Sequence, residues 1–340
     1  MPRTLLVAGA LLVATLGGAW GATPSAAVEP AGYPPDPTTI PTEAHLKVAF
    51  IGDGGSGPGA EAVLRLIRSE GADLVIHSGD FDYGNDPGRW DSLITSILGA
   101  DFPYFASIGD GDVAAWPGYQ RKLEQRLARV KGATSVGDLG VRSACTCRGL
   151  FLILSGVGTM GTGHEAFIRD QLAGDHHIWK VCSWHQTQHA MQVGDKPDAV
   201  GWGAYEAAIQ GGAIIATAHE HSYARTRTLV SAQRQSVDPA CPGADTVCVG
   251  PGRSFVFQSG LGGRSIRSQK RYLPDTYPYG CNGEWADIYT RAQKAQFGAL
   301  FIVLHVDGDP NRARGYFKTI EGATVDSFVI VHSAPVTAGR

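Results

Sequence analysis

Five short segments rich in Gly, Asp and His occur in order along the chain, and each follows a run of apolar, strand-like residues. They are Gly-Asp-Gly-Gly at 52–55, Gly-Asp-Phe-Asp-Tyr at 79–83, Gly-Asp-Gly-Asp at 109–112, Trp-His at 184–185 and His-Glu-His at 219–221. Side chains at the carboxyl ends of adjacent parallel strands converge on one region of space. Oxygen and nitrogen ligands gathered in this way suit hard or borderline metal ions. The series therefore predicts a hydrolytic site that holds two metals.

The apolar pattern alternates between strands and helices along the first part of the chain. Strands are expected at 45–51, 74–77, 103–108, 150–157, 178–183 and 212–218, and helices at 59–70, 90–98, 118–130 and 165–172. This alternation implies parallel pairing through right-handed crossovers. After about Ser254 the pattern becomes β-rich, and strands are expected at 255–258, 299–306, 314–320 and 324–331.

These patterns predict an α/β fold, a four-layer α-β-β-α sandwich of two mixed sheets with helices outside. The chain has 340 residues, of which 45 are Gly, and only 18% are charged, which suits a loop-rich sandwich better than a helical protein. Residues 231–253 and 262–294 are expected to be long surface loops. The net charge of -3 argues against a general nucleic-acid-binding protein, and no basic stripe is expected.

The N-terminus has the pattern of a secretory signal peptide over residues 1–27. Arg3 supplies the positive charge, residues 5–16 the apolar run and residues 17–27 the small residues around a cleavage site. A retained membrane anchor is the alternative, but the apolar run is short for a span. A Pro-rich tether is expected at 28–44 and a single domain at 45–335. We therefore expect a secreted or periplasmic protein without a stable membrane anchor.

Export permits disulfides, and the chain has six cysteines. Cys241 and Cys248 flank a Pro-Gly turn and are the pair that we expect to be bonded. Cys182 lies in an apolar segment and is expected to be a buried free thiol. Cys145 or Cys147, in a strand-like stretch, could pair with Cys281. No cysteine spacing is that of a zinc finger.

Asp53 and Asp80 each come directly after an apolar strand and beside Gly, which permits a tight backbone reversal. Asp53 alone would suggest a helix cap or an Asx-turn, but the company of four similar segments favours metal ligation. His219 and His221 are two residues apart, so in an extended backbone both imidazoles point to one side and Glu220 to the other. His185 ends an apolar strand, where a lone histidine would suggest a packed core residue.

On these motifs, the chain resembles the calcineurin-like metallophosphoesterase superfamily over residues 46–331, and within it the purple acid phosphatase branch. The resemblance implies the metallophosphoesterase fold and hydrolysis of phosphoric monoesters by a metal-activated water. It implies two metal ions, Fe paired with Fe, Zn or Mn. The ligands that it implies are Asp53, Asp80, Tyr83 and His221 for the first metal, and Asp80, Asp110, His185 and His219 for the second. Tyr83 distinguishes this branch from relatives that carry His at the position of Gly55.

The third segment departs from the family pattern Gly-Asn-His followed by Asp or Glu. Asp110 replaces the Asn; it can still bind a metal, but its negative charge repels a phosphate dianion. Gly111 replaces the His that would polarise a phosphoryl oxygen, and losing such a group costs about 10² to 10⁴ in rate. Besides Asp110 itself, His189 and His164 are the candidates for contact with the substrate. Ala218 in place of the family's Gly is a milder change.

Several alternatives stay open on the sequence. A phosphodiester carries one negative charge and would tolerate Asp110 better than a monoester. A catalytically weakened metal- or phosphate-binding protein, or a plain α/β domain without metal, would need no turnover. The expected partner is a small phosphoester and not a nucleic acid, and the oligomeric state is open. Arg225 and Arg227 could meet a phosphate or lie on a solvated loop, while His77 and His305 are expected to pack in the structure.

Overall fold

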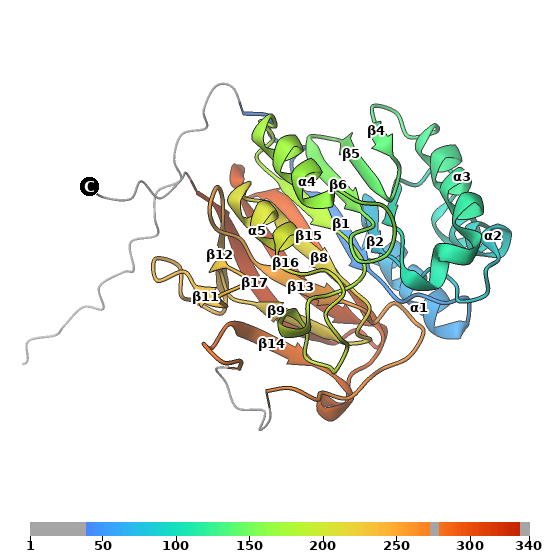
Figure 1. Ribbon diagram of the computed structural model, residues 1–340. Helices are drawn as coiled ribbons and strands as arrows, with labels where there is room; N and C mark the ends of the chain where they lie inside the picture. The colour runs from blue at the N-terminus through green and yellow to red at the C-terminus, as the bar shows by residue number, and fades with distance from the viewer. Residues whose placement is uncertain (1–38, 273–278, 334–340) are drawn as a thin grey trace, which may run out of the picture. The chain divides into compact units, whose positions relative to one another are not determined.

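Two mixed sheets form the centre of the part of the chain that the computed structural model describes, residues 39–272 and 279–333 (Figure 1). In pairing order, the first sheet contains β12 (Thr246–Val249), β17 (Thr324–His332), β16 (Asp309–Thr319), β15 (Gly298–Val306), β1 (Leu46–Ile51), β2 (Leu74–Ser78) and β3 (Tyr104–Ser107). β1, β2 and β3 pair in parallel, as expected, and β15, β16 and β17 continue the sheet from β1 as antiparallel strands.

The second sheet contains the strands that follow the first α/β units. In pairing order they are β14 (Trp285–Tyr289), β9 (Tyr223–Thr226), β13 (Val256–Ser259), β8 (Ile214–Thr217), β7 (Lys180–Ser183), β6 (Leu150–Ser155), β5 (Arg142–Cys147) and β4 (Thr134–Asp138). β6, β7, β8 and β13 pair in parallel. A separate small hairpin is formed by β10 (Leu229–Ser231) and β11 (Ser236–Val237).

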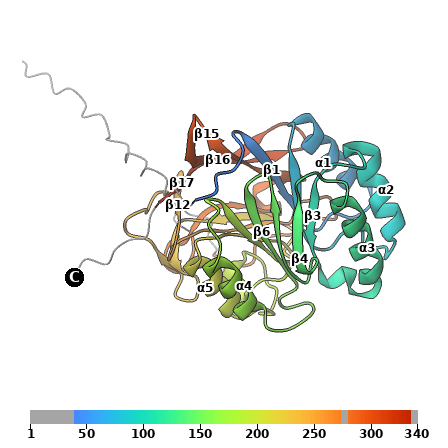
Figure 2. The same cartoon turned by 90° about the horizontal axis from the view of Figure 1, so that it is seen from above.

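Helices cover the outer faces of both sheets, which confirms the four-layer sandwich (Figure 2). The helices beside the first sheet are α1 (Pro58–Ser69), α2 (Pro87–Leu98) and α3 (Trp116–Leu127), and those beside the second are α4 (His164–Ala173) and α5 (Gly203–Gln210). α1, α2 and α3 each have Pro in the first turn, where its missing N–H would have no helical partner. α1 buries Val63, Leu64 and Ile67, the apolar face that the periodicity predicts.

The two sheets pack face to face through aromatic and aliphatic side chains. Phe50 of β1 and Phe257 of β13 meet edge to face with ring centroids 5.0 Å apart. Nearer the carboxyl ends of the strands the contact becomes polar. The Ser107 hydroxyl donates to the Ser183 carbonyl oxygen at 2.8 Å, and the hydroxyls of Ser78 and Ser183 lie 3.0 Å apart. These bonds join β2 and β3 of one sheet to β7 of the other.

The two long loops expected from the sequence are wrong in part, because each contributes a strand to a sheet. The segment 231–253 contains β12, which pairs in parallel with β17, and the segment 262–294 contains β14, which pairs with β9. Both strands are short, β12 lies between Gly- and Pro-containing turns and β14 follows a Gly-containing turn, so their local pattern is weak. Pairing with strands distant in the sequence stabilises them.

The cysteines follow the sequence predictions only in part. Cys241 and Cys248 form the expected disulfide, and Cys182 is a buried free thiol. The proposed bond from Cys145 or Cys147 to Cys281 is wrong. Cys145 and Cys147 are buried free thiols on β5, whereas Cys281 is exposed on a different part of the domain.

Arg225 and Arg227 do not lie on a solvated loop and have protein partners instead of a phosphate. Arg225 is buried on β9 and donates to both carboxylate oxygens of Asp326 at 2.7 and 2.9 Å. The Tyr223 hydroxyl donates to the same carboxylate at 2.6 Å. Arg227 donates to the carbonyl oxygens of Gly283 and Pro242. Both arginines therefore fix β9 and its neighbouring loops.

The predicted signal peptide and most of the predicted tether lie outside the described residues. The end of that tether is bonded to the domain: the Ile40 N–H donates to the His176 carbonyl oxygen at 2.8 Å, and the Ile178 N–H donates to the Ile40 carbonyl oxygen at 3.0 Å. Thr42 is buried. Within residues 39–272 and 279–333, no helix combines the length and apolar character that crossing a bilayer requires.

The buried ion pair between Arg225 and Asp326 gives a test of the fold. Asp326→Ala should lower the free energy of unfolding by about 3–5 kcal/mol, because it leaves the buried guanidinium of Arg225 without its partner. Urea denaturation of the whole chain measures this change. The double variant Arg225→Met/Asp326→Leu should be clearly more stable than Asp326→Ala alone. A double variant as unstable as the single one would contradict the explanation.

Candidate metal centre

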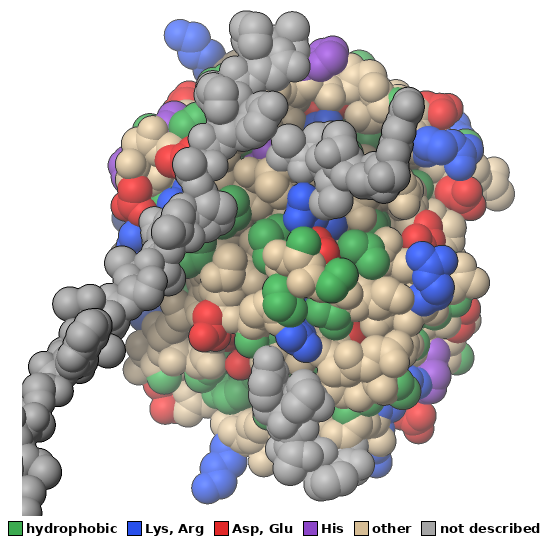
Figure 3. Space-filling view, turned by 90° about the vertical axis from the view of Figure 1, so that its left-hand side faces the viewer, with side chains coloured by type: hydrophobic (Ala, Val, Ile, Leu, Met, Phe, Trp, Pro, Cys, Tyr) green, Lys and Arg blue, Asp and Glu red, His purple; other side chains and the backbone are tan. Residues whose placement is uncertain are grey.

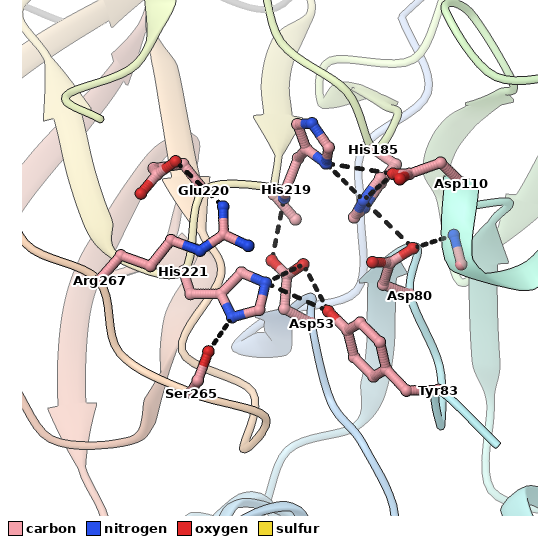
Figure 4. A network of polar contacts seen from close by, with 12 residues as sticks. Asp53, Asp80, Tyr83, Asp110, His185, His219, Glu220, His221, Ser265 and Arg267 are labelled. Atoms are coloured by element: carbon pink, nitrogen blue, oxygen red, sulfur yellow. Dashed lines mark hydrogen bonds and ion pairs between the residues drawn. The ribbon is translucent and has the colours of Figure 1, made fainter. Parts of the chain in front are cut away.

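The structure brings the predicted ligands together where the carboxyl ends of strands from both sheets meet (Figure 4). Among the described residues, two groups of three have ligand atoms within 4.8 Å of one another. One group is Asp53, Asp80 and His185, and the other is Asp110, His185 and His219. His185 belongs to both: its Nε2 lies 3.3 Å from Asp80 Oδ1 and 3.0 Å from Asp110 Oδ1.

The orientation of His185 is set by the backbone of β2. Its Nδ1 lies 2.7 Å from the Ser78 carbonyl oxygen, which can only accept a hydrogen bond. Nδ1 therefore carries a proton, and Nε2 is the nitrogen that faces the carboxylates. The Nδ1 of His219 lies 3.2 Å from this Nε2 and 3.1 Å from Asp110 Oδ1. Both imidazoles thus converge on the Asp110 carboxylate.

Tyr83 and His221 complete the network on the other side of Asp53. The Tyr83 hydroxyl donates to Asp53 Oδ1 at 3.1 Å and lies 3.3 Å from His221 Nε2. His221 Nε2 is also 3.3 Å from Asp53 Oδ1, and its Nδ1 lies 2.6 Å from the Ser265 hydroxyl. All the residues that the resemblance assigns as metal ligands therefore lie in one connected set of polar contacts. Ser265 was not anticipated.

Left-handed backbone conformations place four of these side chains. The φ angles are 55° for Asp53, 58° for Asp80, 57° for Tyr83 and 70° for His219. Aspartate and histidine adopt this region more often than most residues, but for tyrosine it is uncommon. The expected extended geometry of the His-Glu-His segment is therefore wrong. β8 ends at Thr217, and the His219 N–H donates to Asp53 Oδ2 at 2.9 Å, which bends the chain so that both imidazoles still reach the cluster.

Glycines allow the ligand-bearing turns to approach one another. A Cβ on Gly109 would lie 2.2 Å from the Asp80 nitrogen and 2.3 Å from Asp80 Oδ1. A Cβ on Gly79 would lie 2.7 Å from Gly109 and 2.7 Å from the Cβ of His185. The turns after β2, β3 and β7 are thus in contact, and side chains at these two positions would force them apart.

Asp112 holds the turn that carries Asp80. Its buried carboxylate accepts backbone N–H groups from Gly109 at 2.8 Å, Asp80 at 2.9 Å and Phe81 at 2.8 Å. The Gly111 N–H in turn donates to Asp80 Oδ1 at 2.8 Å. The sequence places this aspartate in the third segment. It does not indicate that the carboxylate holds backbone N–H groups in place instead of facing the ligands.

The donor set fits a pair of metal ions. Asp53 is fully buried; burial is the largest effect that raises its pKa to about 8, and the nearby Asp80 charge adds to it. The ionised Asp53 is therefore costly in this position, and a bound cation would offset that cost. Burial also disfavours the charge of Asp80, but His185 outweighs it and holds the pKa of Asp80 below its usual value. Carboxylates, imidazoles and a phenol are ligands that iron, zinc and manganese accept.

The segment that follows β13 contributes residues that the sequence analysis missed. The Arg264 N–H donates to the Asp53 carbonyl oxygen at 3.0 Å, and its guanidinium carbon lies 4.6 Å from the centre of the Tyr83 ring. Arg267 Nη1 lies 3.4 Å from Glu220 Oε2. The sequence feature that could have indicated these residues is the run 264–271, which has four basic residues and no acidic one. The expectation that the chain has no basic stretch is therefore wrong at this loop.

The other histidines occupy different places. His189 Nδ1 lies 2.7 Å from the Lys196 carbonyl oxygen, and His164 Nδ1 lies 3.1 Å from the Ser155 hydroxyl. Among the described contacts, neither ring touches a residue of the ligand cluster, so contact with a substrate stays a prediction for both. His77 is buried with Nδ1 2.8 Å from the Tyr104 hydroxyl, which confirms its packed position. His305 Nδ1 is bonded to the Thr42 carbonyl oxygen at 2.9 Å.

Comparison with solved structures identifies the fold. The purple acid phosphatase PPD1 from seeds of yellow lupin (Lupinus luteus) superposes with a TM-score of 0.61 at 16% identity, over 85% of this chain and 54% of that one. The structure of PhoD gives a TM-score of 0.51 at 11% identity, over 88% of this chain and 75% of that one. The chain thus spans about half the length of the lupin protein. No family model and no curated protein matches the sequence. The chain has the calcineurin-like metallophosphoesterase fold.

Gly109→Ala tests the close approach of the turns. The added methyl group must displace the Asp80 turn, so we expect a loss of bound metal and about 1–3 kcal/mol of unfolding free energy. Elemental analysis and urea denaturation of the purified protein measure the two effects. Gly174→Ala is the matched control, because its nearest neighbouring atom would be 4.0 Å from the new Cβ. Full metal content in Gly109→Ala would show that the turns have room to move.

Proposed function

We propose that the protein is a metal-dependent phosphoesterase that hydrolyses phosphoric monoesters. The observation that supports this most strongly is the convergence of ligand atoms within 4.8 Å, from turns that follow strands of both sheets, on a metallophosphoesterase fold. Two bound metal ions supply a nucleophilic water at neutral pH and stabilise an in-line displacement. No serine or cysteine nucleophile is required.

The residues divide into two ligand sets in this proposal. Asp53, Tyr83 and His221, which contact one another, would hold the first metal, for which we propose iron. Asp110, His185 and His219, which also contact one another, would hold the second, for which we propose iron, zinc or manganese. Asp80, which contacts His185, would help to hold both ions.

A phosphodiester is the second candidate substrate, and Asp110 is the observation that favours it. The Asp110 side chain is 47% exposed at the edge of the cluster, so its charge faces an approaching substrate. A dianionic monoester is repelled more strongly than a monoanionic diester. Gly111 supplies no imidazole that could offset this charge. A Cβ at position 111 would already lie 3.0 Å from Asp80 Oδ1, so there is little space for a side chain there.

We also propose that the enzyme acts outside the cytoplasm on a small phosphoester. The signal-like N-terminus and the disulfide between Cys241 and Cys248 support export. Acidic and basic side chains are interspersed on the face of the molecule in Figure 3. The net charge of -3 supports the expectation that nucleic acid is not the substrate.

The first experiment combines metal analysis with turnover. Natively purified protein should contain about two metal ions per chain. It should hydrolyse p-nitrophenyl phosphate or bis(p-nitrophenyl) phosphate, and Asp80→Asn should lose both metal and activity because Asp80 serves both ions. Two metals without turnover on either ester would favour the catalytically weakened binding protein. Protein that binds no metal under any loading condition would refute the proposal.

Asp110→Asn separates the two ester classes. Removing this negative charge should lower KM for p-nitrophenyl phosphate several-fold and change KM for bis(p-nitrophenyl) phosphate less, because the monoester carries the larger charge. Steady-state kinetics at low ionic strength, with metal content measured in parallel, shows the difference. Equal changes for both esters at unchanged metal content would mean that charge repulsion at Asp110 does not set the preference.

A further inference from the structure

The loop 264–271 lies against the candidate metal centre and carries only positive charge. Its sequence, Arg-Ser-Ile-Arg-Ser-Gln-Lys-Arg, contains four basic residues and no acidic one. Backbone bonds hold it in place: the Arg264 N–H donates to the Asp53 carbonyl oxygen at 3.0 Å, and the Arg267 N–H donates to the His221 carbonyl oxygen at 2.9 Å. The loop is thus bonded directly to two residues of the cluster.

Arg264 places a cation at the rim of the site. The residue is exposed, and its guanidinium carbon lies 4.6 Å from the centre of the Tyr83 ring, whose hydroxyl donates to Asp53. Its side chain lies beside Gly55: a Cβ on that glycine would be 3.8 Å from the Arg264 side chain, an ordinary van der Waals contact. Among the described residues, no carboxylate lies within ion-pair distance of Arg264, so its charge faces solvent.

Arg267 provides a second cation, oriented by a buried carboxylate. Its Nη1 lies 3.4 Å from Glu220 Oε2; the Glu220 side chain is 4% exposed and that of Arg267 is 37% exposed. The backbone of Arg267 is bonded to that of His221, so this guanidinium belongs to a residue that lies beside the cluster. Figure 4 shows Arg267 beside His221, with Asp110 at the opposite end of the network.

We infer that Arg264 and Arg267 bind a second anionic group of the substrate, so that the preferred substrate is a phosphoester that also carries a phosphate or carboxylate. The inference rests on the proposed function, in which the reacting phosphate occupies the metal centre. Guanidinium groups bind phosphate and carboxylate oxygens in a bidentate way. Asp110 repels anions at the opposite end, so the second anionic group lies toward the arginines and the ester is held in one orientation.

A matched pair of non-hydrolysable probes tests this inference: 3-phosphonopropionate carries a carboxylate where propylphosphonate carries a methyl group. Calorimetry on the metal-loaded whole chain should show about tenfold tighter binding of 3-phosphonopropionate. Arg264→Gln and Arg264→Gln/Arg267→Gln should abolish most of this ratio, and Arg264→Lys should retain part of it. Arg169→Gln, which removes a surface arginine of α4, should leave the ratio unchanged.

The outcomes separate this inference from the proposed function. Equal affinity for the two probes in the natural protein, or a ratio that survives Arg264→Gln, would overturn the inference even if the enzyme hydrolyses phosphoesters. A ratio lost in Arg264→Gln would support it even in a protein without turnover, because calorimetry reads binding alone. A role of Arg264 only in packing on Tyr83 would change both affinities equally, and this result would also overturn the inference.

Discussion

The constraint on which the site depends is the burial of the Asp53 carboxylate, which raises its pKa to about 8, beside a second carboxylate, Asp80. Asp53 is fully buried and Asp80 almost so, and both face further polar groups. Backbone donors offset part of this cost: the His219 N–H serves Asp53, and the Gly111 N–H serves Asp80. These backbone donors belong to the turns themselves, so they fix the positions of the two carboxylates. The buried Asp53 carboxylate is thus the group whose charge a bound cation would stabilise most.

The contact between the two sheets makes this geometry possible. Ligands come from turns on both sheets, so they converge only where Ser78, Ser107 and Ser183 join the strand ends. Gly79 and Gly109 then let the turns touch, and left-handed residues such as Tyr83 and His219 aim the side chains. Each such conformation costs about 1–3 kcal/mol and persists only because the surrounding contacts hold it. Packing elsewhere in the domain offsets this conformational cost, as is typical of functional sites.

The sequence predicts well what local pattern determines and poorly what long-range pairing determines. The strand-then-turn series gives the parallel strands and places Asp53, Asp80 and His185, because apolar runs and Gly-Asp turns are local signals. It gives neither β12 nor β14, since these short strands form only by pairing with distant partners. The burial of Arg225 is not predictable from the sequence for the same reason: its ion-pair partner Asp326 lies on β17, far along the chain.

Asp110 and Asp112 lie in the same segment, but their different positions give one a role among the ligands and the other a role in holding the backbone. Asp112 is buried and accepts three backbone N–H groups, whereas Asp110 is half-exposed and faces His185 and His219. The pattern Gly-Asp-Gly-Asp cannot distinguish them, because the turn between β3 and α3 decides which carboxylate points inward. With Asp110 at one end of the cluster and Arg267 at the other, the site has a negative and a positive side. This polarity is what would orient a substrate with a second anionic group in the inference proposed above.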